Sequence, residues 1–245
     1  MGEGLYIMGI LYKDRMKRMV GDWMAMLMEL FYPRVCEVCG KSLIQGEEFL
    51  CSFCLSDFPF ADQSYIVGRE LLEQFEPSCR PEQLFALYYY DKYSVYRNLI
   101  HLIKYHSYKD LGFYLGRMLG EKLKPYCEAD VIIPIPLHRR REWERGFNQA
   151  LEIAKGINEV LQVELLRDVV VRVKNNVSQT GKNATERFGN VENVFELVTP
   201  ELVAGRHVLL VDDVVTTGAT IGSCLRVIAQ AGDVRFSLAC LAKTL

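Results

Sequence analysis

Several features that would point to common protein classes are absent from this sequence. No apolar stretch reaches the ~20 residues that a membrane-spanning helix needs. The formal net charge is only −2, so any site for a polyanion has to be a local patch. The Gly-x4-Gly-Lys-Ser/Thr pattern of P-loop enzymes and a helix-turn-helix pattern are both missing, which disfavours a nucleotide triphosphatase and a duplex-reading regulator.

A secretory signal is also not evident. Charged residues such as Lys13, Asp14 and Arg15 interrupt the apolar N-terminal segment, and no small-residue cleavage site follows. We therefore expect a cytoplasmic protein without membrane insertion. In that reducing compartment the 8 cysteines favour metal binding over disulfides.

The length of 245 residues and a hydrophobic content of 50% suffice for one good-sized domain and a small module. We predict an N-terminal segment and amphipathic helix over residues 1–30, a zinc ribbon over 31–60 and an α/β domain over 80–245.

Two Cys-x2-Cys pairs mark the predicted small module. Cys36 and Cys39 form the first pair, with Gly40 suited to the tight turn behind it, and Cys51 and Cys54 form the second. Four thiolates can close tetrahedrally around Zn²⁺ and leave no open position, so we expect structural zinc. The other cysteines are expected to be small core residues: Cys79, Cys127, Cys224 and Cys240.

Apolar runs alternate with helical patterns in the rest of the chain, which is typical of a parallel α/β sheet. In such a sheet ligands bind at the carboxyl ends of the strands. The predicted strands are residues 84–90, 131–136, 169–173, 208–211 and 234–241, and residues 194–197 are predicted to be a short strand or hairpin arm. The predicted helices are residues 95–105, 109–124, 145–161 and 218–231, and residues 55–82 are predicted to be a mixed connector.

The most specific stretch follows the run Val208–Val211. Two carboxylates, Asp212 and Asp213, come next, and then a small-residue loop that leads into a helix. Loop amides and a helix N-terminus suit a phosphate, with added donors from threonine hydroxyls. The two acids suit ribose hydroxyls or Mg²⁺. The stretch thus predicts a sugar-phosphate site, although a solvated loop with an ordinary N-cap is an alternative.

A second candidate site follows the strand that ends at Pro136. It contains four arginines, Arg139, Arg140, Arg141 and Arg145. Such a cluster suits a diphosphate or a nucleic-acid backbone, and a solvated basic loop is the alternative. The tyrosines between residues 88 and 108 are interpreted as half-buried surface, with a base-stacking platform as the alternative.

The polar segment 174–190 is long for a connector inside a compact domain, which favours a lid or binding loop. It contains Ser178, Gln179, Thr180 and Arg187.

These motifs resemble, in combination, those of the ComF (ComFC) competence-protein family. The matching stretches span about residue 30 to the end of the sequence. They are the four cysteines, Pro134-Ile135-Pro136-Leu137-His138-Arg139-Arg140, Arg145-Gly146-Phe147-Asn148-Gln149, Ser178-Gln179-Thr180, Glu186-Arg187, and Val211 through Thr220. The resemblance implies a type I phosphoribosyltransferase-like fold behind a zinc ribbon. It also implies a role in natural transformation, the handling of incoming single-stranded DNA, beside a helicase-like ATPase partner.

The resemblance also implies roles for particular residues toward 5-phosphoribosyl 1-diphosphate (PRPP) and its Mg²⁺. Asp212 and Asp213 match the ribose-contacting acids, which are the candidate catalytic residues. The loop around the 5′-phosphate is matched by Val215, Thr216, Thr217, Gly218, Ala219 and Thr220. Ile135 and Pro136 match the diphosphate loop, beside Arg139 and Arg145, and residues 174–190 match the flexible lid.

Two departures from the wider phosphoribosyltransferase pattern leave the activity open. Thr216 stands where enzymes acting on 6-oxopurines carry a carboxylate base, and threonine cannot do that work. No C-terminal hood for a base follows the last predicted strand, so residues 55–95 or the zinc module would have to supply one. The hypotheses are therefore an active phosphoribosyltransferase, a catalytically inactive PRPP sensor, and a DNA-binding scaffold.

Overall fold

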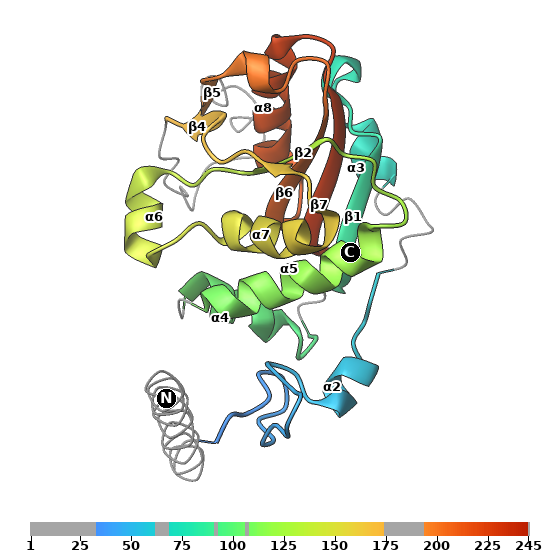
Figure 1. Cartoon of the computed structure of the whole chain (residues 1–245), viewed down its shortest axis with the longest axis vertical. Helices are drawn as coiled ribbons and strands as arrows, with labels where there is room; N and C mark the ends of the chain where they lie inside the picture. The colour runs from blue at the N-terminus through green and yellow to red at the C-terminus, as the bar shows by residue number, and fades with distance from the viewer. Residues whose placement is uncertain (1–32, 62–68, 91–92, 106–107, 174–193, 245) are drawn as a thin grey trace, which may run out of the picture. The chain divides into compact units, whose positions relative to one another are not determined.

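The structure is a computed structural model that describes residues 33–61, 69–90, 93–105, 108–173 and 194–244 (Figure 1). The chain divides into two compact units, Met1–Asp57 and Phe58–Leu245. The finer boundaries predicted near residues 30, 60 and 80 stay predictions. The predicted N-terminal helix and the predicted lid, with Ser178, Gln179, Thr180 and Arg187, lie outside the described residues.

The first unit, as far as it is described, is two turns of chain that carry the cysteine pairs and one short helix, α2 (Ser52–Ser56). Gly40 has φ +72° and its N–H donates to the carbonyl of Cys36 at 2.8 Å, which closes the tight turn that glycine permits. The Glu47 carboxylate accepts hydrogen bonds from the Ser52 backbone N–H and hydroxyl, both at 2.6 Å, and so fixes the start of α2.

The second unit is built on a five-stranded sheet in the order β1-β7-β6-β2-β3, in which every neighbouring pair is parallel. The strands of this sheet are β1 (Gln83–Tyr90), β2 (Val131–Pro134), β3 (Glu164–Leu165), β6 (His207–Val215) and β7 (Arg235–Thr244). The helices are α3 (Arg69–Glu73), α4 (Arg97–Tyr105), α5 (Lys109–Leu123), α6 (Arg139–Arg145), α7 (Gln149–Leu161) and α8 (Ala219–Ile228). Short 3₁₀ turns are η1 (Pro77–Cys79), η3 (Pro200–Leu202) and η4 (Ala229–Ala231).

Two helices, α5 and α7, cover one face of the sheet, and α8 covers the other (Figure 1). On α5 a leucine returns every fourth residue, and the four side chains are fully buried: Leu111, Leu115, Leu119 and Leu123. Residues four apart lie on one face of a helix, so this stripe packs inward. The α8 face buries Cys224, Leu225 and Ile228 against the β-strands.

The structure corrects three sequence predictions. β6 does not stop at Val211 but continues through both aspartates to Val215, because β7 pairs along it beyond the point where β2 ends. β4 (Val170–Arg172), predicted as a strand of the parallel sheet, instead forms a separate antiparallel pair with β5 (Phe195–Leu197). The supposed connector over residues 55–82 contains the helix α3 and the turn η1.

The other predicted strands and helices agree with the structure to within a few residues. Of the scattered cysteines, Cys79, Cys224 and Cys240 are buried as predicted, whereas Cys127 is only half-buried. Among the described residues, no helix has the length and apolar character that crossing a membrane requires.

Candidate functional site

The two candidate sites meet at the carboxyl edge of neighbouring strands. β2 and β6 run in parallel up to the pair Pro134–Val211. One more hydrogen bond follows, from the Ile135 N–H to the Val211 carbonyl at 2.9 Å, before the chains separate. Proline has no N–H for a ladder, so Pro136 cannot extend β2 alongside β6. The segment 135–139 therefore leaves the sheet beside Asp212 and Asp213, which remain in β6 alongside β7.

Asp212 and Asp213 lie on opposite faces of the sheet, because side chains alternate along a strand. Val208 and Leu210 pack in the core on the α8 face, which places Asp212 on that face and Asp213 on the other. The Asp213 carboxylate pairs with Lys104 of α4, with Oδ2 and Nζ 3.1 Å apart. Their side chains are only 15% and 25% exposed, so this ion pair is shielded from water.

Asp212 carries the stronger electrostatic perturbation. Burial, and then the negative charge of Asp213, raise the pKa of its carboxyl to about 7. The Asp213 N–H, which donates to Asp212 Oδ1 at 2.8 Å, and the charges of Lys104 and Arg172 act in the opposite direction. Two adjacent carboxylates without a cation between them cannot both ionise at low cost. A divalent cation or a hydrogen-bonding diol at this position relieves that repulsion.

The loop after β6 presents donors to solvent. Thr216, Thr217, Ala219 and Thr220 are exposed, whereas Val215 and Gly218 are buried. Gly218 caps α8 with φ +72°, and its carbonyl accepts the Gly222 N–H at 2.8 Å. The first N–H groups of an α-helix have no partner within the helix. Together with the threonine hydroxyls they form a site suited to a phosphate.

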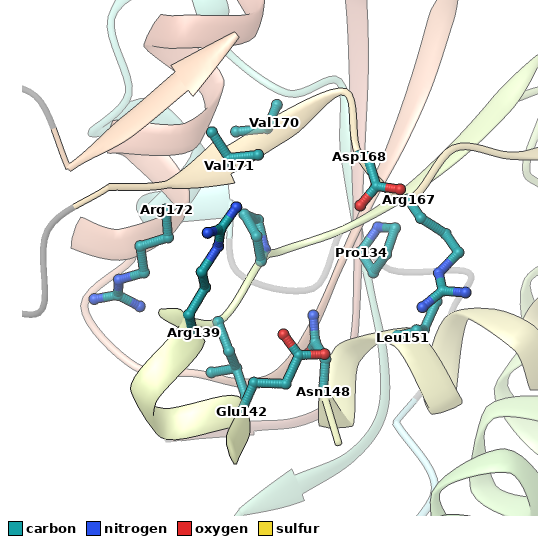
Figure 2. A pocket seen from close by; sticks show the side chains of 12 residues that line it. Pro134, Arg139, Glu142, Asn148, Leu151, Arg167, Asp168, Val170, Val171 and Arg172 are labelled. Atoms are coloured by element: carbon teal, nitrogen blue, oxygen red, sulfur yellow. The ribbon is translucent and has the colours of Figure 1, made fainter. Parts of the chain in front are cut away.

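A pocket of about 160 Å³ lies between the segment after β2, α6, and the β4 strand (Figure 2). Its residues are Pro134, Pro136, Leu137, Arg139, Glu142, Asn148, Leu151, Arg167, Asp168, Val170, Val171 and Arg172. Asn148, in the wall of the pocket, is held in place by two hydrogen bonds. It caps α7 by accepting the Ala150 N–H at 3.0 Å, and its Nδ2 donates to the Ile135 carbonyl, also at 3.0 Å. The segment after β2 is thereby tied to the start of α7.

The basic cluster that the sequence predicts as one site is divided in the structure. The arginines form the helix α6, which begins with the Arg140 N–H donating to His138 Nδ1 at 3.2 Å. Arg139 lines the pocket. Arg145 instead donates to Gln149 Oε1 at 2.9 Å and stacks over the Tyr105 ring at 5.8 Å. The roles of Ile135, Pro136, Arg139 and Arg145 toward a diphosphate stay predictions.

The four predicted zinc ligands come together. The sulfur atoms of Cys36, Cys39, Cys51 and Cys54 all lie within 4.8 Å of one another. Cys39 Sγ and Cys51 Sγ are 3.7 Å apart, whereas a tetrahedron of Zn–S bonds of about 2.3 Å has edges of about 3.8 Å. The cluster therefore fits a metal ion such as zinc.

The pKa values of the clustered thiols are also consistent with a bound cation. Burial acts to raise the pKa of Cys36, but backbone N–H groups, first that of Cys51 at 3.3 Å, lower it to about 7. Burial and the neighbouring thiols raise the pKa of Cys54. Four thiols so close together cannot all ionise without a compensating cation, which Zn²⁺ supplies.

Three residues at the site were not predicted from the sequence: Lys104, Arg167 and Arg172. Each lies far along the chain from the aspartates, and no local pattern distinguishes it from other surface cations. The Lys104–Asp213 contact and the pocket wall arise only when the sheet assembles. A single basic residue near the end of a helix, as Lys104, or just before or within a strand, as Arg167 and Arg172, gives no usable signal in the sequence.

This combination, a parallel α/β sheet with an acidic strand end and a Thr/Gly loop, defines a phosphoribosyltransferase-like domain. The family model described as phosphoribosyl transferase domain matches residues 146–244. The chain is 30% identical over 198 residues to Competence protein F of Haemophilus influenzae, covering 80% of this chain and 79% of the relative. It therefore belongs to the ComF/YhgH competence-protein family.

Two further relatives agree with this assignment. DNA utilization protein YhgH of Escherichia coli K12 is 27% identical over 247 residues, covering 98% of this chain and 100% of its own length. Competence protein ComFC of Bacillus subtilis is 36% identical over 102 residues, covering 42% of this chain and 39% of the relative.

The similarity to solved structures is lower. A purine phosphoribosyltransferase from Pyrococcus horikoshii is 21% identical with a TM-score of 0.35, over 55% of this chain and 72% of that one. A glutamine PRPP amidotransferase from B. subtilis is 20% identical with a TM-score of 0.38, over 57% of this chain and 30% of that one. The fold assignment therefore depends on the sheet order and on the family match.

Proposed function

We propose that this protein binds Mg²⁺-PRPP at the carboxyl end of β6 and acts in the handling of incoming single-stranded DNA. The observation that carries the first part is the aspartate pair beside a threonine-lined helix N-terminus. Carboxylate oxygens suit the ribose hydroxyls and the Mg²⁺ that accompanies the diphosphate, and the loop Val215–Thr220 suits the 5′-phosphate. The family match and the names of the relatives support the second part.

Two geometric features support a bound sugar phosphate in particular. The aspartates reach opposite faces of the sheet at an edge where β2 has already ended, and both residues are partly exposed there. The exposed Thr216, Thr217 and Thr220 follow within one short loop. A ligand with a diol and a phosphate on one five-membered ring matches donors and acceptors arranged in this order.

The test is calorimetric titration of PRPP with Mg²⁺ into the wild type and into the double variant Asp212→Asn/Asp213→Asn. We expect binding by the wild type and a loss of at least tenfold in the variant, because amides neither bind Mg²⁺ strongly nor carry charge. A zinc-loaded, folded wild type that binds no PRPP contradicts the proposal. Release of diphosphate, followed with candidate acceptors in the same samples, separates a transferase from a sensor that binds without turnover.

A separate surface supports contact with single-stranded DNA. Tyr105, at the end of α4, is 65% exposed, with the His101 ring 4.7 Å away and the Arg145 guanidinium over its face. Exposed aromatic rings beside cations bind single strands by base stacking and phosphate contact. Two further basic residues, Lys174 and Lys182, belong to the predicted lid and lie outside the described residues.

Fluorescence anisotropy with a labelled oligothymidine tests this surface. The double variant Tyr105→Ala/Arg145→Gln should weaken binding about tenfold, since each stacked base contributes ~1–3 kcal/mol. Tyr126→Ala, which removes an exposed tyrosine beyond the end of α5, is the matched control and should bind as the wild type does. Equal affinity of all three proteins contradicts a role for Tyr105 and Arg145.

The remaining parts of the proposal rest on the family. A cytoplasmic location suits four thiols that bind structural zinc. A helicase-like ATPase is the proposed protein partner, and co-purification of the two proteins with and without single-stranded DNA tests it. A catalytically inactive PRPP sensor and a DNA-binding scaffold remain the alternatives to a transferase.

A further inference from the structure

The helix α6 presents a tryptophan that takes no part in the core. The Trp143 side chain is 85% exposed, the largest exposed fraction among the large hydrophobic residues that the structure describes. Among those residues its indole makes no aromatic or cation–π contact. It also does not line the pocket beside α6. A single exposed hydrophobic residue is ordinary, so the surroundings of Trp143 decide what it can bind.

The helix that carries Trp143 is not explained by packing. α6 has 7 residues and none of them is buried, whereas a helix of a globular protein normally buries one face. Its two ends are fixed locally instead. His138 accepts the Arg140 N–H at the start, and Gly146 ends the helix with φ +78°. The helix therefore holds a set of side chains toward solvent in a defined arrangement.

The charge of α6 is opposite in sign to that of the chain. The helix has four arginines against two glutamates, which leaves two positive charges, whereas the whole chain has a net charge of −2. Arg140 precedes Trp143 by three residues, a spacing that brings side chains together on a helix surface. Its ion pair with Glu144, at 2.9 Å, has side chains that are 71% and 49% exposed, and such pairs are weak. Arg140 is therefore able to contact an anion beside the indole ring.

A flat aromatic ring beside a guanidinium suits a single-stranded nucleic acid. An unpaired base stacks on the ring, and the cation contacts the adjoining phosphate. A duplex has its base faces covered by neighbouring bases, so it offers only the phosphate contact. An acidic peptide pairs with arginine but has no ring that has to stack on the indole, and a membrane surface requires a wider apolar face than one residue provides.

We propose that Trp143 and Arg140 form a site on the exposed face of α6 that stacks a base of single-stranded DNA and contacts its phosphate. The assignment to DNA rests on the proposed function above. The site is separate from the surface around Tyr105, because Arg145, which lies over that ring, follows Trp143 by two residues and so points to the other side of the helix. A strand that crosses α6 thus meets an aromatic ring on either side of it.

Tryptophan fluorescence tests the stacking directly. The chain has 2 tryptophans, so the variant Trp23→Phe leaves Trp143 as the only one. A base stacked on an indole quenches its emission. We expect oligothymidine to quench this variant along its binding curve, and a duplex or an abasic strand of the same length to leave the emission unchanged. If Trp23→Phe does not fold, the affinities of the Trp143 variants in the wild-type background decide.

Fluorescence anisotropy with labelled oligothymidine supplies those affinities. Trp143→Ala should weaken binding about tenfold, and Trp143→Phe, which keeps a ring, should retain part of the affinity. Arg140→Gln should lower the slope of log affinity against log salt by about one, because one phosphate contact is lost. Glu144→Gln should tighten binding, since it removes a negative charge and releases Arg140, an effect that damage to the helix cannot produce. Tyr126→Ala is the matched control and should bind as the wild type does.

The outcomes separate this inference from the proposed function. If oligothymidine binds the wild type and Trp143→Ala equally and quenches nothing, the inference is wrong and the proposed function stands. If the wild type binds no oligothymidine, the inference and the DNA part of the proposed function both fail, while PRPP titration still decides the other part. PRPP should bind Trp143→Ala as it binds the wild type, because Trp143 is not in the pocket wall.

Three further probes test the choice of partner. Polyglutamate or anionic vesicles that quench Trp143 where oligothymidine does not would assign this face to another partner and overturn the inference. Oligouridine should quench as oligothymidine does, since neither a stacked base nor a phosphate contact reads the 2′-hydroxyl. Binding of oligouridine alone would overturn the assignment to DNA.

Discussion

Adjacent residues can have very different surroundings at the end of a strand, and Asp212 and Asp213 are an example. Asp213 faces α4 and has a lysine at 3.1 Å, whereas Asp212 faces α8, among Cys224, Cys240 and Arg172. Asp213 thus has a cationic partner, whereas burial and the charge of Asp213 raise the pKa of the Asp212 carboxyl. Two negative charges at these positions therefore repel each other, and a bound cation or a hydrogen-bonding diol reduces that repulsion.

The raised pKa of Asp212 predicts how stability changes with pH. Its ordinary pKa is 3.8 and its folded pKa about 7, so the folded state binds the proton more tightly than the unfolded state. The stabilisation is complete below the unfolded pKa, and it is lost as pH rises from about 4 to 7. Asp212→Asn should therefore gain roughly 1–3 kcal/mol over the wild type at pH 8 and little at pH 4.

Urea unfolding at several pH values, without Mg²⁺ or PRPP, measures this difference. The free energy of unfolding of the wild type is subtracted from that of the variant at each pH. This difference cancels the titration of all groups that the two proteins share. A difference that stays constant between pH 4 and 8 shows that Asp212 titrates normally.

Glycine is favoured at position 218 for two reasons, a positive φ and a lack of space for a side chain, and the two effects can be measured separately. Its φ is +72°, and an added Cβ would lie 2.9 Å from Phe75 Cζ and 3.1 Å from Leu71 Cδ1. Gly205 has nearly the same φ, +71°, but no atom within 4 Å of a Cβ. We expect Gly205→Ala to lose about 1 kcal/mol and Gly218→Ala about 2–3 kcal/mol of unfolding free energy, measured by urea denaturation. Equal losses mean that only the backbone matters at Gly218.

At the scale of elements, the helices α5 and α7 pack backbone against backbone at two glycines. A Cβ on Gly116 would lie 2.2 Å from the Ile153 carbonyl oxygen, and one on Gly156 would lie 2.1 Å from that of Phe113. Backbone oxygens cannot move aside as side-chain ends can. The two helices therefore approach so closely only because glycine stands at both positions. The helix α7 in turn packs against β2 and β6.

Alanine at two positions of α5 tests this packing. Gly116→Ala should cost about 3 kcal/mol or more in unfolding free energy, because α5 and α7 must separate. Gly112→Ala is the control on the same helix, with its Cβ at an ordinary 3.5 Å from Glu152 Cβ. It should be neutral or gain up to ~1 kcal/mol from helix propensity. Urea denaturation of the two variants gives the comparison, and a loss of similar size in both contradicts the packing argument.

The elements that the sequence predicts well are those with a local cause. Apolar runs in the sequence correspond to β1, β2 and β7, and a leucine at every fourth position corresponds to the buried face of α5. The end of β6 was predicted wrongly because charge normally ends a buried strand, while here the partner strand β7 continues beside Asp212 and Val215. β4 was placed in the wrong sheet, because its pairing with residues 195–197, which were predicted to be a short strand or hairpin arm, is not encoded in its own residues.

At the scale of the whole molecule, the same distinction applies to the candidate site. The aspartates, the Thr/Gly loop and the four cysteines are contiguous motifs, so their spacing was informative. The contacts that complete the site join Lys104 to Asp213, and Arg139 to Arg172 across a pocket. Such contacts depend on topology, and a single sequence contains no pairing information for them.

The division into two units predicts that the metal site and the α/β core can fail separately. The core on the α8 face contains only residues from Ala61 onward, all of them in the second unit. Zinc binding supplies on the order of 10 kcal/mol to the folding of small cysteine modules. Cys51→Ser/Cys54→Ser should therefore lose the metal and expose residues 33–57 to protease, while the urea transition of the second unit is retained.

Metal analysis and limited proteolysis followed by mass spectrometry check both halves of this prediction, and Cys127→Ser is the matched control. Cys127 is a half-buried cysteine outside the cluster, so its variant should keep zinc and resist cleavage. If the double variant retained its metal, the four sulfurs would not be the ligands. If the urea transition of the second unit also disappeared, the two units would fold as one, because a unit with its own core has no need of a metal bound elsewhere in the chain.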